Sequence, residues 1–89
     1  MIVEIRSPGD ESYDKLPFYA NLGVPEVWII DRDTKKPEVF ALKGTVYESQ
    51  AADADGWIRS AAVGVTLKAE NQKLLVRFGD ETEAVVVPT

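Results

Sequence analysis

The stretch LGVPEVWIID, residues 22–31, decides the fold. Its run VWII, residues 27–30, is continuously apolar, whereas a strand with one solvated face alternates apolar and polar residues. Gly23 and Pro25 separate this run from the segment before it. We therefore expect residues 27–31 to form a strand that is buried on both faces and lies in the middle of a sheet rather than at its edge.

A short helix is expected just before this strand, from about residue 10 to residue 22. Asp10 is a suitable N-cap, and Tyr13, Leu16, Phe18, Tyr19 and Leu22 give a partly helical apolar pattern. Pro17 interrupts that pattern, because proline inside a helix costs about 3 kcal/mol unless it falls in the first turn. The helix therefore either begins near Leu16 or is kinked at Pro17, with Gly23 as its C-cap.

The rest of the chain is typical of short β-strands joined by turns. Residues 1–6 are rich in β-branched side chains and stop at the turn sequence SPGD, and Lys43-Gly44 and Asn71-Gln72 are hairpin signals. The other expected strands are residues 38–43, 45–49, 57–60, 65–70, 73–78 and 83–87. The sequence thus predicts an α+β domain with one short helix on a bent, mostly antiparallel sheet of six or seven strands. Its expected buried residues are Val3, Ile5, Val27, Trp28, Ile29, Phe40 and Val46.

Composition limits the classes of function. The 89 residues are enough for one domain, and the absence of Cys and His excludes disulfides and the usual zinc sites, so any metal would be a hard cation on oxygen ligands. The net charge of -5 argues against a broad nucleic-acid footprint, although a local basic patch can exist on an acidic protein. No apolar run approaches the roughly 20 residues of a membrane span. We expect a cytoplasmic protein without a membrane partner.

Residues 2–31 resemble a bacterial family of restriction-endonuclease-like proteins with a nuclease core of the PD-(D/E)xK type. The family pattern is a V-E-V strand followed by S-P, a helix with K-x-x-x-Y, and then G-V-x-E-Y-W and a strand ending in I-D. Here VEI at residues 3–5, SP at 7–8, Lys15 with Tyr19, GV at 23–24, Glu26, Trp28 and ID at 30–31 fall in register. The resemblance is firm over the first third of the chain and looser as far as about residue 60.

This resemblance implies Mg²⁺-assisted hydrolysis of DNA phosphodiesters. Glu4 matches the carboxylate metal ligand, the backbone carbonyl of Ile5 matches a further oxygen ligand, and Lys15 matches the lysine that orients or deprotonates water. Arg6 occupies the usual third position of the motif; it cannot act as a base, although it could hold a phosphate. Arg6 and Tyr19 are therefore the candidate substrate-binding residues.

The resemblance also implies an upstream strand with a metal-binding aspartate, ahead of Met1. The chain then corresponds to the C-terminal part of a family member, either truncated at its start codon or derived from a longer gene. With one carboxylate the Mg²⁺ site would be weak, and we expect no turnover by this chain alone unless a second subunit or a separate polypeptide supplies the aspartate.

Simpler interpretations compete with each of these roles. Without the resemblance, Glu4 is a cross-strand ion-pair partner and Lys15 a solvated side chain. Glu26 is either a structural partner for Lys15 or a residue that supports the site, and the structural role is favoured. The acidic pairs Asp31 with Asp33 and Asp53 with Asp55 are expected to form a turn and a solvated loop.

Two functions follow from the sequence. The first is a metal-dependent endonuclease domain acting through Glu4 and Lys15. The second is a non-catalytic domain that keeps the nuclease-like sheet and self-associates, because an open apolar strand edge is a template for pairing. In either case we expect a homo-oligomer, most simply a two-fold dimer.

Overall fold

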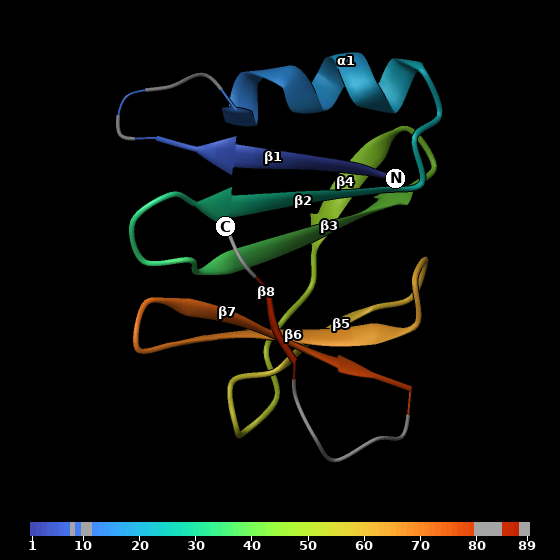
Figure 1. Cartoon of the computed structure of the whole chain (residues 1–89). Helices are drawn as coiled ribbons and strands as arrows, with labels where there is room; N and C mark the ends of the chain where they lie inside the picture. Colours follow the sequence, from blue (N-terminus) through green and yellow to red (C-terminus); the bar gives the residue numbers. More distant parts are fainter. Residues whose placement is uncertain (8, 10–11, 80–84, 88–89) are drawn as a thin grey trace.

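A computed structural model describes residues 1–7, 9, 12–79 and 85–87. These residues form two four-stranded sheets and one helical segment. The first sheet has the order β1-β2-β3-β4, and the second has the order β5-β6-β7-β8 (Figure 1). The strands are β1 (Ile2–Arg6), β2 (Glu26–Asp31), β3 (Pro37–Lys43), β4 (Val46–Ser49), β5 (Ile58–Ser60), β6 (Val65–Glu70), β7 (Lys73–Phe78) and β8 (Val85–Val87).

The prediction of one bent sheet was wrong in its number of sheets and strands. A mixed α+β fold with one short helix is confirmed, and each described strand pair except the parallel pair β1–β2 is antiparallel. The eight strands divide into two sheets because the chain leaves the first sheet after Ser49 and begins a separate meander at Ile58. Residues 83 and 84, expected at the start of the last strand, lie outside the described residues.

The central strand β2 is as expected. It lies between β1 and β3, and every residue from Glu26 to Ile30 is buried. Its Trp28 and Ile30 join Val39 in the main apolar core, where they pack against the second sheet through Val65, Leu67, Leu74 and Val76. Val27 and Ile29 point to the opposite face, which α1 covers (Figure 1).

The apolar core contains fewer of the N-terminal side chains than the sequence predicted. Val27, Trp28 and Ile29 are buried as expected, and Phe40 is half-buried. However, Val3, Ile5 and Val46 are 45%, 49% and 64% exposed. Val3 and Ile5 share a face with Trp28 and Ile30, but they lie on an outer strand of the sheet, and the core cluster does not extend to them.

The helical segment begins as one turn of 3-10 helix, η1 (Ser12–Lys15), and continues as α1 (Leu16–Asn21). This confirms a helix that starts near Leu16, because Pro17 then falls in the first turn, where its missing N–H costs nothing. At the other end the N–H of Gly23 donates to Ala20 and that of Val24 to Tyr19, which is a Schellman motif with Gly23 at φ +73°. The expected N-cap, Asp10, lies outside the described residues.

Candidate functional site

The β1 strand divides its side chains between two faces. Its parallel register with β2 pairs Glu4 with Ile29 and Arg6 with Asp31, so Glu4 and Arg6 point to the face that α1 covers. The intervening Ile5 points to the other face. Glu4 is therefore held at the border between the helix and the outer strand of the sheet, with 19% of its side chain exposed.

Glu4, Lys15 and Tyr19 converge on one carboxylate oxygen. The Lys15 ammonium nitrogen lies 3.5 Å from Glu4 Oε1, and the Tyr19 hydroxyl donates a hydrogen bond to the same oxygen. Lys15 and Tyr19 reach it together because residues four apart lie on one side of a helical segment. The hydrogen bond to Glu4 raises the pKa of Tyr19, which keeps its phenol protonated as a donor. The expected approach of Glu4 and Lys15 is confirmed, whereas their catalytic roles stay predictions.

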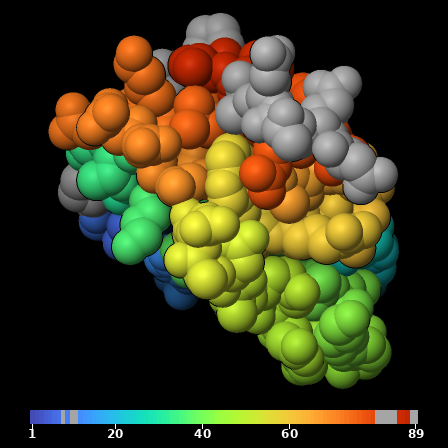
Figure 2. Space-filling model, turned by 90° about the horizontal axis from the view of Figure 1, so that it is seen from below, coloured from blue at the N-terminus to red at the C-terminus, as the bar shows by residue number. Residues whose placement is uncertain are grey.

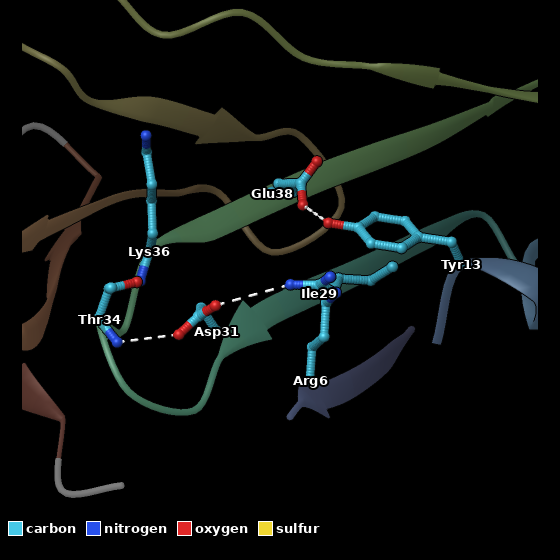
Figure 3. Close-up of a pocket in the computed structure, with 7 residues that line it drawn as sticks. All are labelled: Arg6, Tyr13, Ile29, Asp31, Thr34, Lys36 and Glu38. Atoms are coloured by element: carbon cyan, nitrogen blue, oxygen red, sulfur yellow. Dashed lines mark hydrogen bonds and ion pairs between the residues drawn. The ribbon is translucent and has the colours of Figure 1, made fainter. Parts of the chain in front are cut away.

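Arg6 lies in a neighbouring cavity of about 440 Å³ on the same face of the sheet (Figure 3). Its guanidinium is 3.7 Å from Asp31 Oδ2 and stacks over the Tyr13 ring at 5.1 Å, while its Nε is buried without a described partner. The ion pair with Asp31 uses one terminal nitrogen of the guanidinium, so Arg6 keeps further N–H donors that a phosphate could accept. The cavity is lined by Arg6, Tyr13, Ile29, Asp31, Thr34, Lys36 and Glu38.

Two residues beside the site, Tyr13 and Glu38, were not predicted to contribute to it. The Tyr13 hydroxyl donates to Glu38, and this hydrogen bond raises the pKa of the phenol (Figure 3). Glu38 arrives there because the register places it opposite Ile29, which in turn pairs with Glu4. The alternation in residues 38–43 places Glu38 on one face of its strand, but the register that places it opposite Ile29 has no signal in the sequence.

Asp31 ends β2 as the expected turn residue. Its Oδ1 accepts the backbone N–H groups of Asp33 and Thr34, both at 2.9 Å. These bonds, led by that from Thr34, lower the pKa of Asp31. The Asp31 carboxylate therefore stays charged opposite Arg6, and its hydrogen bonds hold it in place in the lining of the cavity.

Glu26 has the structural role that was favoured, but its partners differ from the expected one. The side chain is 2% exposed and accepts hydrogen bonds from Trp28 Nε1 at 2.6 Å, the Ser60 hydroxyl, and the Ala62 N–H at 3.1 Å. It does not contact Lys15. Because Ser60 and Ala62 belong to the second half of the chain, Glu26 ties the two sheets together.

The oxygen atoms available to a metal ion are few. No hydrogen bond to a described residue occupies Glu4 Oε2, and only Oε1 has described partners. The Arg6 carbonyl accepts from the Arg32 N–H on the β2 side, and successive strand carbonyls alternate in direction, so the Ile5 carbonyl points to the outer edge of β1. The described residues contain no group of three or more His, Cys, Asp or Glu side chains that could hold an ion.

A family model described as "Uma2: Putative restriction endonuclease" matches residues 1–70. This match covers β1, the helical segment and the remaining strands as far as β6. Comparisons with curated proteins and with solved structures give no match. None of the helices among the described residues is long and apolar enough to cross a membrane.

Proposed function

Since the chain belongs to this Uma2 family of putative restriction endonucleases, we propose that it is a nuclease-type domain whose phosphodiester chemistry on DNA is carried by Glu4 and Lys15. The observation that supports this proposal is the cluster on Glu4 Oε1, where an ammonium and a phenol meet one partly exposed carboxylate. Both Glu4 and Lys15 stand at the positions that match the family pattern.

Each residue of the cluster has a distinct chemical role in this proposal. The Lys15 side chain is 52% exposed, so its ammonium can leave Glu4 to neutralise a non-bridging phosphate oxygen or to orient the attacking water. Tyr19 holds the carboxylate in place and presents its hydroxyl at the border with solvent. Arg6 supplies a second cation for a neighbouring phosphate through the N–H donors that Asp31 does not use.

Mg²⁺ would be held by the Glu4 carboxylate and the Ile5 carbonyl. Mg²⁺ is commonly bound through one or two carboxylates together with waters and substrate phosphates, so these two oxygens fit a weak site rather than a closed cage. When bound, the ion would supply Lewis-acid stabilisation of the phosphate. Because one carboxylate is a poor anchor, we expect turnover only when another strand brings a second carboxylate to the outer edge of β1.

A second candidate function is self-association without catalysis. It is supported by the outer position of β1 in its sheet and by the exposure of Val3 and Ile5, which are 45% and 49% exposed. An outer strand that carries exposed apolar side chains is a surface on which a second copy can add a strand.

Nicking of supercoiled plasmid in millimolar Mg²⁺ or Mn²⁺ distinguishes the two. We expect nicking only where a second copy or a partner chain supplies a further carboxylate, and we expect that activity to disappear in Glu4→Gln and Lys15→Ala. Glu70→Gln, at an exposed carboxylate of the second sheet, is the matched control and should behave as wild type. Cleavage that survives Glu4→Gln would exclude the proposed site.

A further inference from the structure

The outer face of the second sheet gathers basic side chains around a tryptophan. Val65, Leu67, Leu74 and Val76 point into the core, so Thr66, Lys68 and Glu70 of β6 and Leu75 and Arg77 of β7 point outward. Arg59 pairs with Thr66 and joins this face, as does Lys73, four residues before Arg77 on the same strand. We call Trp57, Arg59, Lys68, Lys73 and Arg77 the outer basic face. Figure 2 views the molecule from the side of the second sheet, with the yellow segment of residues 50–60 next to the orange segment that includes β7.

The loop before β5 is built to hold Trp57 against this face. Asp53 Oδ1 accepts the N–H groups of Asp55 and Trp57 at 2.9 and 3.0 Å, and the Asp53 N–H donates to the Trp57 carbonyl at 2.8 Å. The Arg77 guanidinium carbon lies 4.2 Å from the centre of the Trp57 ring, and Lys68 Nζ lies 5.7 Å from it. A stacked guanidinium keeps its in-plane N–H donors available. Of the Arg77 nitrogens, only Nε donates a hydrogen bond to a described residue, at 3.3 Å to Thr66 Oγ1.

The charge of this face contrasts with that of the rest of the molecule. The chain carries -5 overall, yet four of its ten Lys and Arg residues lie here. Arg6, Lys15 and Arg32 each form an ion pair with a carboxylate, whereas none of these four cations does so within the part of the chain that the structure describes. Two carboxylates nevertheless lie near this face, because Glu70 is opposite Lys73 in the β6–β7 register and Asp53 interacts electrostatically with Arg77. Adjacent strands are about 4.8 Å apart, so Arg59 and Arg77 are spread over roughly 10 Å. Such spacing suits an extended polyanion better than a single small anion.

We propose that the outer basic face binds a single nucleic-acid strand. The phosphates contact Arg59, Lys68 and Arg77, Lys73 extends the basic track, and a base stacks against the Trp57–Arg77 pair. Single strands are commonly held by this combination of a basic surface and an aromatic platform, on which stacking tolerates any base. The surface lies beyond the second sheet, away from the Glu4 face of the first. It goes beyond the proposed function, because binding here does not require that Glu4 and Lys15 be catalytic.

A labelled oligothymidylate tests this proposal by fluorescence anisotropy at low salt. We expect saturable binding that Trp57→Ala and Arg77→Ala each weaken about tenfold, within the range measured for lost stacking. Arg77→Ala should also reduce the slope of log affinity against log salt by about 0.7, the share of one phosphate contact on a single strand. Intrinsic fluorescence should be quenched on binding in wild type, because Trp57 is partly exposed whereas Trp28 is buried.

Matched controls distinguish binding at this face from binding elsewhere on the protein. Lys43→Ala removes an exposed cation of the first sheet, outside the outer basic face, so it should bind the oligonucleotide as wild type does. Circular dichroism checks that the Arg77 and Trp57 variants are folded. Lys68→Glu should also weaken the affinity for the oligonucleotide while leaving Arg77 unchanged. Equal affinity of Lys43→Ala and Arg77→Ala, or equal affinity for oligothymidylate and polyglutamate, would overturn the proposal.

Discussion

The buried carboxylate of Glu26 shows how one residue fastens the two sheets. Its oxygens accept hydrogen bonds from Trp28, Ser60 and Ala62, so three donors depend on one side chain. The sequence could not predict this, because a Glu beside an apolar run is usually solvated, and its partners lie 34 and 36 residues away.

Replacing Glu26 should therefore be costly. Glu26→Ala leaves three polar groups without their acceptor, and each unsatisfied buried group costs about 1 to 3 kcal/mol, so we expect a loss of about 3 kcal/mol or more in the free energy of unfolding. Glu26→Gln keeps an acceptor oxygen and should cost less. Urea unfolding of both variants measures the difference. Glu70→Ala, at an exposed carboxylate, should change stability by less than about 0.5 kcal/mol. A loss no larger in Glu26→Ala than in Glu70→Ala would contradict the role of this carboxylate.

Asp53 makes the Trp57 loop sensitive to acid. Hydrogen bonds from the Trp57 N–H and then the Asp55 N–H lower the pKa of Asp53 in the folded state. A lowered carboxyl pKa stabilises the loop above the ordinary aspartate pKa of about 3.9, and this stabilisation is lost as the pH falls through the folded-state pKa. We expect Trp57 emission to change below about pH 4 in wild type, and Asp53→Ala to show the acid-type emission already at pH 7. Identical emission curves for the two proteins would contradict this coupling.

Among the elements, the helical segment could be predicted most fully from sequence. Pro17 and Gly23 fix its first and last turns by local backbone constraints, which need no knowledge of distant residues. The strands were also found, but their assembly into two sheets was not, because strand pairing across a long connection leaves no local signal. For the same reason Val3 and Ile5 were assigned to the core on the basis of their apolarity alone.

Gly23 offers a test of the helix end. Its φ of +73° favours glycine, and a Cβ added there would meet no neighbouring atom, so any penalty is one of backbone conformation. We expect Gly23→Ala to lower the free energy of unfolding by about 1 kcal/mol and Gly23→Asn to cost less, because asparagine tolerates this conformation better. Thermal unfolding of the two variants gives the comparison; equal stability of Gly23→Ala and wild type would show that Gly23 does not end the helix in this way.

At the scale of the whole molecule, the second candidate function predicts association through the outer edge of β1. Two-fold pairing of β1 strands would cover Val3 and Ile5, and closed two-fold symmetry is the commonest arrangement of identical chains. We expect light scattering at micromolar concentration to give twice the 9.8 kDa chain mass, and Ile5→Lys to give the single-chain mass. Val63→Lys, at another exposed apolar position, is the control and should remain dimeric. A wild-type mass near 9.8 kDa would exclude this association.

The candidate site was also predictable only where its contacts join residues that are close in the sequence. Glu4, Lys15 and Tyr19 were identified because the family pattern records their spacing within 16 residues, and the structure brings them together. The Tyr13–Glu38 contact and the pairing of Arg6 with Asp31 depend on sheet register and were not foreseen. The part of the site that rests on short-range spacing was therefore predictable, and the part that rests on register was not.

The central claim is that Glu4 and the edge of β1 form the polar centre of a nuclease-type site. Titration of isotopically labelled protein with Mn²⁺, followed by NMR, tests it most directly, because a paramagnetic ion broadens the signals of nearby nuclei whether or not DNA is cleaved. At millimolar Mn²⁺ we predict broadening centred on the amides of Glu4, Ile5 and Lys15, and its loss in Glu4→Gln but not in Glu70→Gln. Broadening confined to the acidic loop at Asp53 and Asp55, or broadening at β1 that persists in Glu4→Gln, would contradict the account.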